Sequence, residues 1–135
     1  MNLKALTAAL AAAALLAACG TSPRTSTPAA AQPSTPTQSA DGTLIGPDGR
    51  TLYTFKRDVA GSGKSACVDA CAANWPPLPV TTGAVPLGDY TIITRADGSK
   101  QWAFKGMPLY YYVKDTKAGD KLGDGMGGNW TAARP

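Results

Sequence analysis

Two cysteines near the middle of the chain have a spacing that allows disulfide, redox or metal chemistry. Cys67 and Cys71 are four positions apart, so on a helix they share a face with Cα atoms roughly 6 Å apart, within reach of a disulfide. A disulfide is the default expectation for an exported protein. A disulfide that closes so short a loop should stabilise the fold by less than the about 3 kcal/mol estimated for a loop of about 15 residues. A reversible dithiol therefore stays open, as does a Cu(I) site with Met107 or Met126.

A pattern of tyrosine, aromatic residue and aspartate occurs twice, at the same distance behind a glycine. The motif residues are Tyr53, Phe55 and Asp58 in the first copy and Tyr110, Tyr112 and Asp115 in the second. An Asn-Trp pair follows each copy, ending at Trp75 and at Trp130. The repeated spacing predicts two related units. We expect most of the aromatic rings in the core, with tyrosine hydroxyls bonded to groups such as Asp58 and Asp115.

Three aromatic residues are candidates for a ligand surface instead. These are Trp75, Tyr111 and Trp130. Tyr111 alternates with its neighbours, so we expect it on the other face of its strand and exposed to solvent. A clustered tyrosine and tryptophan surface stacks on a sugar, a quinone or a flavin, or relays electrons.

The composition excludes several classes of reaction and partner. The chain has no histidine, and every acidic residue is aspartate, so the standard Ser-His-Asp and Cys-His sites are excluded and the commonest zinc and haem ligand is missing. Gly63-Lys64-Ser65 resembles the end of a phosphate-binding loop, but Asp58 stands where its first glycine belongs, so we expect no nucleotide. The basic residues form no run, which argues against nucleic acid. The C-terminal aspartates do not have the spacing of a calcium loop, so we predict no metal site there.

The first 40 residues predict a targeting segment and a tether. Residues 1–18 combine Lys4 with an apolar run, which is typical of a signal peptide. The small residues before Cys19 are typical of a bacterial lipobox, so we expect cleavage there and lipid on Cys19. Residues 19–40 are rich in Ser, Thr, Pro and Ala and predict a disordered tether. We therefore expect a lipid-anchored protein of the bacterial cell envelope, in the outer membrane if the cell has two, because Gly20 is not the retaining aspartate.

Residues 41–135 predict one compact domain, mainly β with one short helix. Turn chemistry at Pro47-Asp48-Gly49 predicts a hairpin over 43–55, and Asp58 just beyond it can cap a turn or reach back toward Tyr53. Alanines after Ser65 as N-cap predict a helix over 65–74, which the following prolines end. Strands are expected at 90–95, 100–104 and 109–113, and the glycine-rich tail from Asp115 as loop. The fold class is therefore a small α+β domain of two repeat-related antiparallel units.

The residues described so far resemble a known family. The two tyrosine motifs, together with Cys67-x-x-x-Cys71-x-x-Asn74-Trp75-Pro76-Pro77, are similar to the bacterial secreted-repeat lipoproteins known by the Yx(F/W/Y)xxD motif. The resemblance covers about residues 43–134. The function of that family is uncharacterised, and its members have been suggested to take part in envelope electron transfer or stress responses. The second copy lacks the cysteines, which confines any thiol chemistry to one half.

These observations leave three functional hypotheses. The first is a non-enzymatic, membrane-anchored envelope module, structural or binding, with a Cys67–Cys71 disulfide. The second is an envelope redox protein that uses the two cysteines or a bound cofactor, and the third is a binder of wall polysaccharide. The expected partners are the membrane, through the lipid, and an envelope protein or a wall glycan. No cofactor is assigned; a redox cofactor or Cu(I) stays open.

Overall fold

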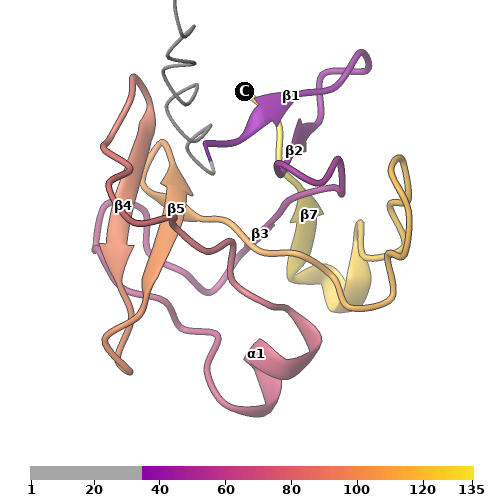
Figure 1. Cartoon of the computed structure of the whole chain (residues 1–135). Helices are drawn as coiled ribbons and strands as arrows, with labels where there is room; N and C mark the ends of the chain where they lie inside the picture. The colour runs from indigo at the N-terminus through magenta and orange to yellow at the C-terminus, as the bar shows by residue number, and fades with distance from the viewer. Residues whose placement is uncertain (1–34) are drawn as a thin grey trace, which may run out of the picture.

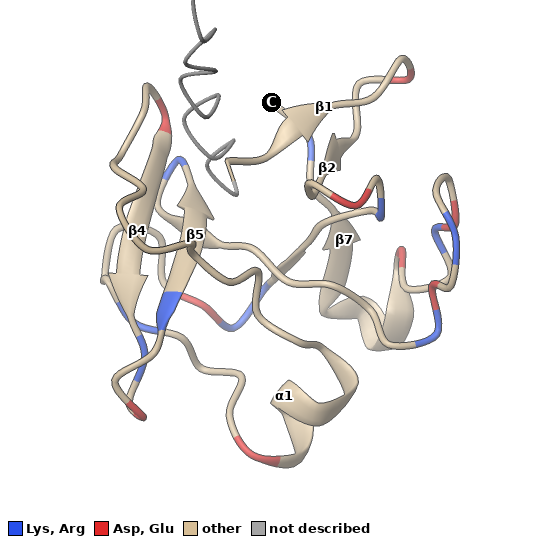
Figure 2. Cartoon of the chain, viewed as in Figure 1, with Lys and Arg blue, Asp and Glu red and all other residues tan. Residues whose placement is uncertain are grey.

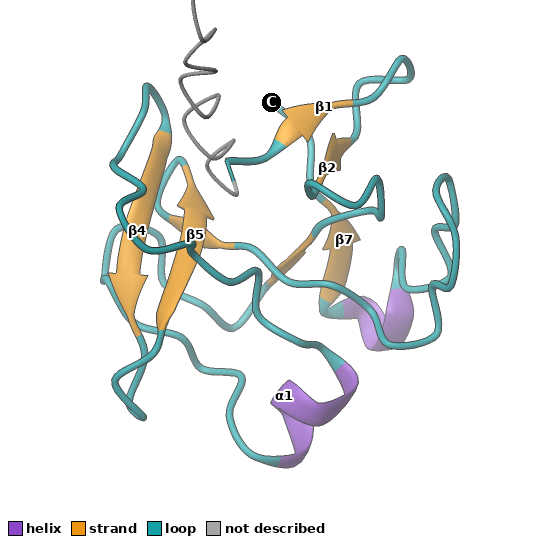
Figure 3. Cartoon of the chain, in the orientation of Figure 1, coloured by secondary structure: helices purple, strands orange, loops and turns teal. Residues whose placement is uncertain are grey.

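The computed structural model describes residues 35–135. The predicted signal peptide, Cys19 and most of the predicted tether lie outside the described residues. The described part forms three small antiparallel sheets with one short helix (Figures 1 and 3). The chain is therefore mainly β with a short helix, and both copies of the tyrosine motif lie in one domain, as the sequence predicts. Within residues 35–135 no helix is long and apolar enough to cross a bilayer.

The strands are short, and two of the three sheets are simple pairs. The pairs are β1 (Thr37–Gln38) with β2 (Leu44–Ile45), and β3 (Tyr53–Phe55) with β7 (Trp130–Ala132). The third sheet has the order β4-β5-β6, with β4 at Tyr90–Thr94, β5 at Lys100–Phe104 and β6 at Met107–Pro108. The helix α1 is Ala70–Asn74, and a 3-10 turn, η1, is Met126–Gly128. β4 and β5 pair over their full length from Tyr90↔Phe104 to Thr94↔Lys100.

The ends of the domain differ from the prediction. β1 pairs with β2 through Gln38↔Leu44, so ordered structure begins inside the segment that the sequence assigns to the tether. The glycine-rich tail is not all loop, because β7 pairs with β3 through Tyr53↔Ala132 and Phe55↔Trp130. Figure 1 shows this last strand beside β3, far from it in the sequence. Alternate residues of β7 are buried, and this burial stabilises the strand although the glycine-rich sequence around it suggests a loop.

The predicted helix and the predicted last strand are also corrected. α1 covers only Ala70–Asn74, since Ser65 and Ala66 bond to distant side chains instead of beginning a helix. Residues 109–113 do not form a continuous strand. Tyr110 makes single bridge pairings with Tyr53, at the start of β3, and with Pro77, which lies outside any strand.

Two clusters of apolar side chains form the core, one on each face of the repeated motif. The first cluster contains Leu44, Leu52, Leu78, Trp102, Phe104, Leu109, Tyr111 and Ala133. The second contains Tyr53, Phe55, Cys67, Trp75, Tyr110, Tyr112, Trp130 and Ala132. Alternation along each motif sorts neighbouring side chains into different clusters.

The prediction that Tyr111 is exposed is wrong. It does face the side opposite its neighbours, but that side is the first core cluster, and the residue is only 6% exposed. The Arg50 guanidinium covers the ring at 4.2 Å from its centroid. A Cβ at Gly46 would lie 2.0 Å from the Tyr111 hydroxyl oxygen, so glycine is required there for the ring to fit.

Candidate functional site

The two motif copies meet at their first tyrosines. The Tyr53 amide donates to the Tyr110 carbonyl over 2.8 Å, and the Tyr110 amide donates to the Tyr53 carbonyl over 3.0 Å. This reciprocal antiparallel pair relates the copies by an approximate two-fold rotation. The side chains around it follow the same rotation, so the site is built from equivalent residues of both copies.

The tyrosine of each copy bonds to the aspartate of the other. Tyr53 Oη donates to Asp115 Oδ2 over 2.5 Å, and Tyr110 Oη donates to Asp58 Oδ2 over 2.6 Å. The expectation that tyrosine hydroxyls bond to these carboxylates is confirmed. The expectation that Asp58 reaches back toward Tyr53 is wrong, because the antiparallel pairing carries each hydroxyl to the aspartate of the other copy.

The second oxygen of each carboxylate receives a backbone amide from the loop that follows it. We call residues 59–67 the first return loop and residues 116–123 the second return loop. In the first, the Ala66 amide donates to Asp58 Oδ1 over 2.6 Å. In the second, the Leu122 amide donates to Asp115 Oδ1 over 3.0 Å. Each aspartate therefore joins its own return loop to the tyrosine of the other copy.

Each return loop also contacts the tyrosine hydroxyl itself. Ser65 Oγ lies 2.7 Å from Tyr110 Oη, and the Gly123 amide donates to Tyr53 Oη over 3.3 Å. Burial raises the pKa of both phenols well above the usual range, and the neighbouring carboxylates reinforce the shift. Burial also raises the pKa of Asp58, against the opposing effects of its two hydrogen bonds and the Arg95 charge. Both phenols therefore remain protonated donors at neutral pH.

Four aromatic rings stack in a continuous row between the two copies, which we call the aromatic column. The rings follow the order Phe55, Trp130, Trp75 and Tyr112, with centroid separations of 4.3, 3.8 and 4.3 Å. The two central indoles lie 4° from parallel. Tyr53 meets Trp75 edge-on at 5.3 Å, and Tyr110 meets Trp130 edge-on at 5.2 Å. Motif residue and tryptophan are again exchanged, because Phe55 stacks on the second tryptophan and Tyr112 on the first.

The aromatic column contains two of the three residues predicted to form a ligand surface. Trp75 and Trp130 are 5% and 6% exposed, and their faces cover each other and the rings of Phe55 and Tyr112. The structure thus brings these two tryptophans together in the interior, while Tyr111 lies in the other core cluster. The three residues do not form one surface.

Cys67 and Cys71 form the disulfide that the spacing predicts, with Cα atoms 5.2 Å apart. The helical geometry expected for the pair is wrong, because only Cys71 lies in α1. Asp69, between the cysteines, has φ 54° and ψ −123°, a backbone region that L-residues rarely adopt. Cys67 belongs to the second core cluster, and Cys71 packs at its margin. Neither sulfur is a free thiolate in this state, and no group of three or more His, Cys, Asp or Glu side chains within residues 35–135 is arranged to hold a metal ion.

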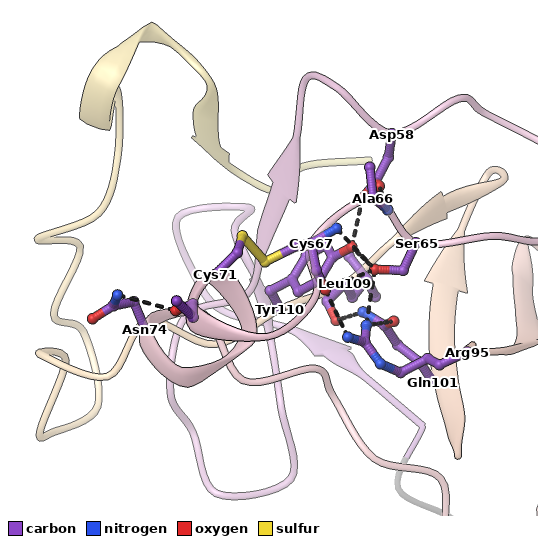
Figure 4. The surroundings of a disulfide bond; sticks show 11 residues. Asp58, Ser65, Ala66, Cys67, Cys71, Asn74, Arg95, Gln101, Leu109 and Tyr110 are labelled. Carbon is purple, nitrogen blue, oxygen red and sulfur yellow. Dashed lines mark hydrogen bonds between the residues drawn. A yellow bond between two sulfur atoms is a disulfide. The ribbon is translucent and has the colours of Figure 1, made fainter. Parts of the chain in front are cut away.

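Arg95 is the functional-site residue that sequence reasoning missed. Its guanidinium is buried, with the residue 7% exposed, and bonds to three acceptors (Figure 4). Nη1 donates to Ser65 Oγ over 2.9 Å and to Gln101 Oε1 over 2.7 Å, and Nη2 donates to the Cys67 carbonyl over 2.6 Å. Alternation with buried Ile93 places Arg95 on the inner face and is the signal that identifies it.

The comparisons with known proteins agree with the duplicated geometry. A family model described as "secreted repeat of unknown function" matches residues 35–79 and again residues 91–134. Each match contains one motif copy and one tryptophan of the aromatic column, so the repeat units of the family are the units that exchange contacts here. No curated protein and no solved structure shows significant similarity to the chain. The chain belongs to this secreted-repeat family, of which it carries two copies in one domain.

Proposed function

We propose that this protein is a lipid-anchored module of the bacterial cell envelope, structural or binding in role, which catalyses no reaction. The proposal rests on the observation that the motif tyrosines and aspartates bond to each other and to backbone amides inside the domain. Tyr53 and Tyr110 are fully buried, and each donates to a carboxylate whose other oxygen accepts a backbone amide. Groups that resemble an acid–base site therefore hold the repeats together.

The location rests on the sequence of the N-terminal region and on the family. The apolar leader, the small residues before Cys19 and the Pro-rich segment after it support lipid attachment at Cys19 followed by a spacer. The family description, a secreted repeat, agrees with export. We place the anchor in the outer membrane where the cell has two.

The surface of the module supports attachment through lipid rather than through charge. Along the ribbon in the view of Figure 2, Lys and Arg positions are interspersed with Asp positions. A wall glycan is the weaker of the two expected partners, because the indole faces that would stack on sugar rings are buried in the aromatic column. We therefore propose an envelope protein as the partner.

The experiment is intact mass spectrometry of the protein purified from the membranes of its own cells. We expect cleavage before Cys19, acyl mass on that residue and recovery in the membrane fraction. Cys19→Ser should remove the acyl mass and the membrane association. Ser22→Ala, in the same segment, is the matched control and should change neither. A mature chain with an unmodified Cys19 thiol would overturn the proposal.

A further inference from the structure

We propose that Cys67–Cys71 is an exchangeable disulfide that accepts two electrons and two protons from a protein dithiol of the envelope. The inference goes beyond the anchored module proposed above, which needs no redox change. It rests on three observations: the second return loop has no bridge, the backbone between the cysteines is in an unfavourable conformation, and the two cysteines have unequal surroundings (Figure 4).

The bridge is not required to build the site, because the other half of the molecule does without one. The second return loop delivers the Leu122 amide to Asp115 and the Gly123 amide to Tyr53. These are the counterparts of the contacts that the first return loop makes with Asp58 and Tyr110. The same geometry is thus reached with no cross-link, so the disulfide adds something other than the arrangement itself.

The backbone inside the disulfide loop is held in an unfavourable conformation. Asp69 and Lys105 are the two non-glycine residues with positive φ within residues 35–135, at 54° and 47°. Asp69 makes no side-chain capping bond to α1 that would compensate. Because closure of the short loop holds Asp69 in place, opening the bridge lets it relax, and this favours the dithiol.

The two cysteines differ in burial and in the charge that lies near them. Cys67 is fully buried, whereas Cys71 is half-buried at the start of α1. An incoming thiolate therefore reaches Cys71 first. The Arg95 guanidinium bonds to the Cys67 carbonyl and brings its positive charge to the residue that must leave as a thiolate. A stabilised leaving thiolate accelerates exchange.

The proposed step conserves atoms and electrons. A thiolate of the partner attacks Cys71 Sγ, the Cys67–Cys71 bond breaks, and Cys67 departs as a thiolate that takes up a proton. The second thiol of the partner loses its proton and attacks the mixed disulfide, which releases Cys71 as a thiol. The partner is oxidised to a disulfide, and this protein ends with two thiols.

The first test is a redox titration of the full-length lipidated protein in detergent, in glutathione buffers. Alkylation and mass spectrometry measure the fraction of Cys67 and Cys71 that is reduced, and near-ultraviolet circular dichroism reports the fold. We expect both forms to coexist at ratios within the glutathione range, with the fold retained. A disulfide that stays closed throughout, or opens only when the fold is lost, overturns the proposal. The Cys19 lipidation test is independent of either result.

Substitution of the strained residue supplies a matched pair. Asp69→Gly removes the unfavourable conformation and should shift the equilibrium about threefold to tenfold toward the disulfide, net of the greater flexibility of glycine. Lys105→Gly relieves the other positive-φ residue, which lies outside the disulfide loop, and should leave the equilibrium unchanged. Equal equilibria in Asp69→Gly and the unmodified protein would overturn the argument from strain.

The rate of exchange tests the role assigned to Arg95 as a positioning and electrostatic residue. Arg95→Met should slow reduction by a small dithiol about tenfold, because a higher leaving-group pKa slows departure. Arg95→Lys, which keeps the charge, should recover part of that loss, whereas a purely structural role predicts equal rates in both variants. If Arg95→Met does not fold, the titration and the Asp69→Gly pair still decide the proposal.

Discussion

The two return loops arrive at equivalent places but are held there by different means. The first is fixed by the disulfide at Cys67 and by the buried Arg95 guanidinium. The second is fixed by aspartate side chains that accept backbone amides, with Asp120 bonded to Thr116 and Lys117. An ion pair between Lys121 and Asp41 adds a tie to the N-terminal segment. The two repeats therefore share the position at which each return loop ends, but they differ in the interactions that hold the loop there.

The difference separates the geometry that both repeats share from the chemistry that the disulfide adds to it. Both halves bury a phenol, satisfy a carboxylate and contribute one indole to the aromatic column. Only the first half carries the disulfide, and the second half supplies the buried Arg95 guanidinium that bonds beside it. A function common to both repeats belongs to the shared framework, and a function of this chain alone belongs to the first return loop.

The largest effect is expected from removing an indole, which tests whether the halves contribute equally to the aromatic column. Trp75→Ala and Trp130→Ala each delete a buried ring that stacks on two others. We expect each to lower the free energy of unfolding by about 3–5 kcal/mol, measured by urea denaturation followed by circular dichroism. Val85→Ala, at a side chain that is exposed, is the control and should stay within about 0.5 kcal/mol. A loss confined to one tryptophan would break the equivalence.

An intermediate effect is expected at the glycine that precedes each motif. Gly49 and Gly106 have the same φ of 81°, which costs any L-residue roughly 1–2 kcal/mol. A Cβ at Gly49 meets only Ala118 at 3.4 Å, whereas one at Gly106 lies 2.5 Å from the Gly61 amide nitrogen. Gly49→Ala should therefore cost about 1–2 kcal/mol.

Gly106→Ala should cost about 3 kcal/mol or more, since the backbone of the first return loop must also move. Thermal and urea unfolding of both variants measure the difference. Equal losses would show that the first return loop yields easily at Gly61 and would remove one distinction between the halves.

The smallest effect is a difference in the sign of a pH dependence. Burial raises the pKa of Asp58, so the stability linked to its proton is fully present below the unfolded value near 3.9 and is lost as pH rises through the folded value. Bonds from Ser99 lower the pKa of exposed Asp97, so its contribution is present above the unfolded value and is lost on acidification.

The destabilisation caused by Asp58→Asn should therefore shrink as pH rises from about 3.5 to 7. That caused by Asp97→Asn should grow over the same interval. Urea denaturation at several pH values measures both trends. A parallel trend in the two variants would contradict the assignment of Asp58 as a carboxylate whose burial outweighs its hydrogen bonds.

Local patterns predicted much of this fold. The Asp97-Gly98 turn and the alternation around it place two strands at 90–95 and 100–104, close to the observed β4 and β5. Pro47-Asp48-Gly49 predicts a hairpin turn, and the Gly46 amide does bond to the Arg50 carbonyl over 3.0 Å. Short-range turn chemistry and period-two burial are sufficient for these elements.

Contacts between distant segments were beyond that reasoning. The motif places Asp58 five positions after Tyr53, and nothing in the spacing indicates that its donor is Tyr110. Ser65 looks like a helix N-cap, but the phenol and the guanidinium that meet its hydroxyl come from the other half of the chain. The strand at Trp130 depends likewise on pairing with Phe55. Tertiary partners decided each of these cases.

The exchanged tyrosine–aspartate bonds mean that one repeat by itself is incomplete. An isolated copy has a hydroxyl with no acceptor and a carboxylate with no donor, so half of this molecule lacks a closed core. The missing half can be joined by a peptide bond, as here, or supplied by a second identical polypeptide related by rotation, since the contacts are self-complementary. A chain with a single copy is thus expected to assemble as a symmetric homodimer, and the tandem chain is its covalently fused form.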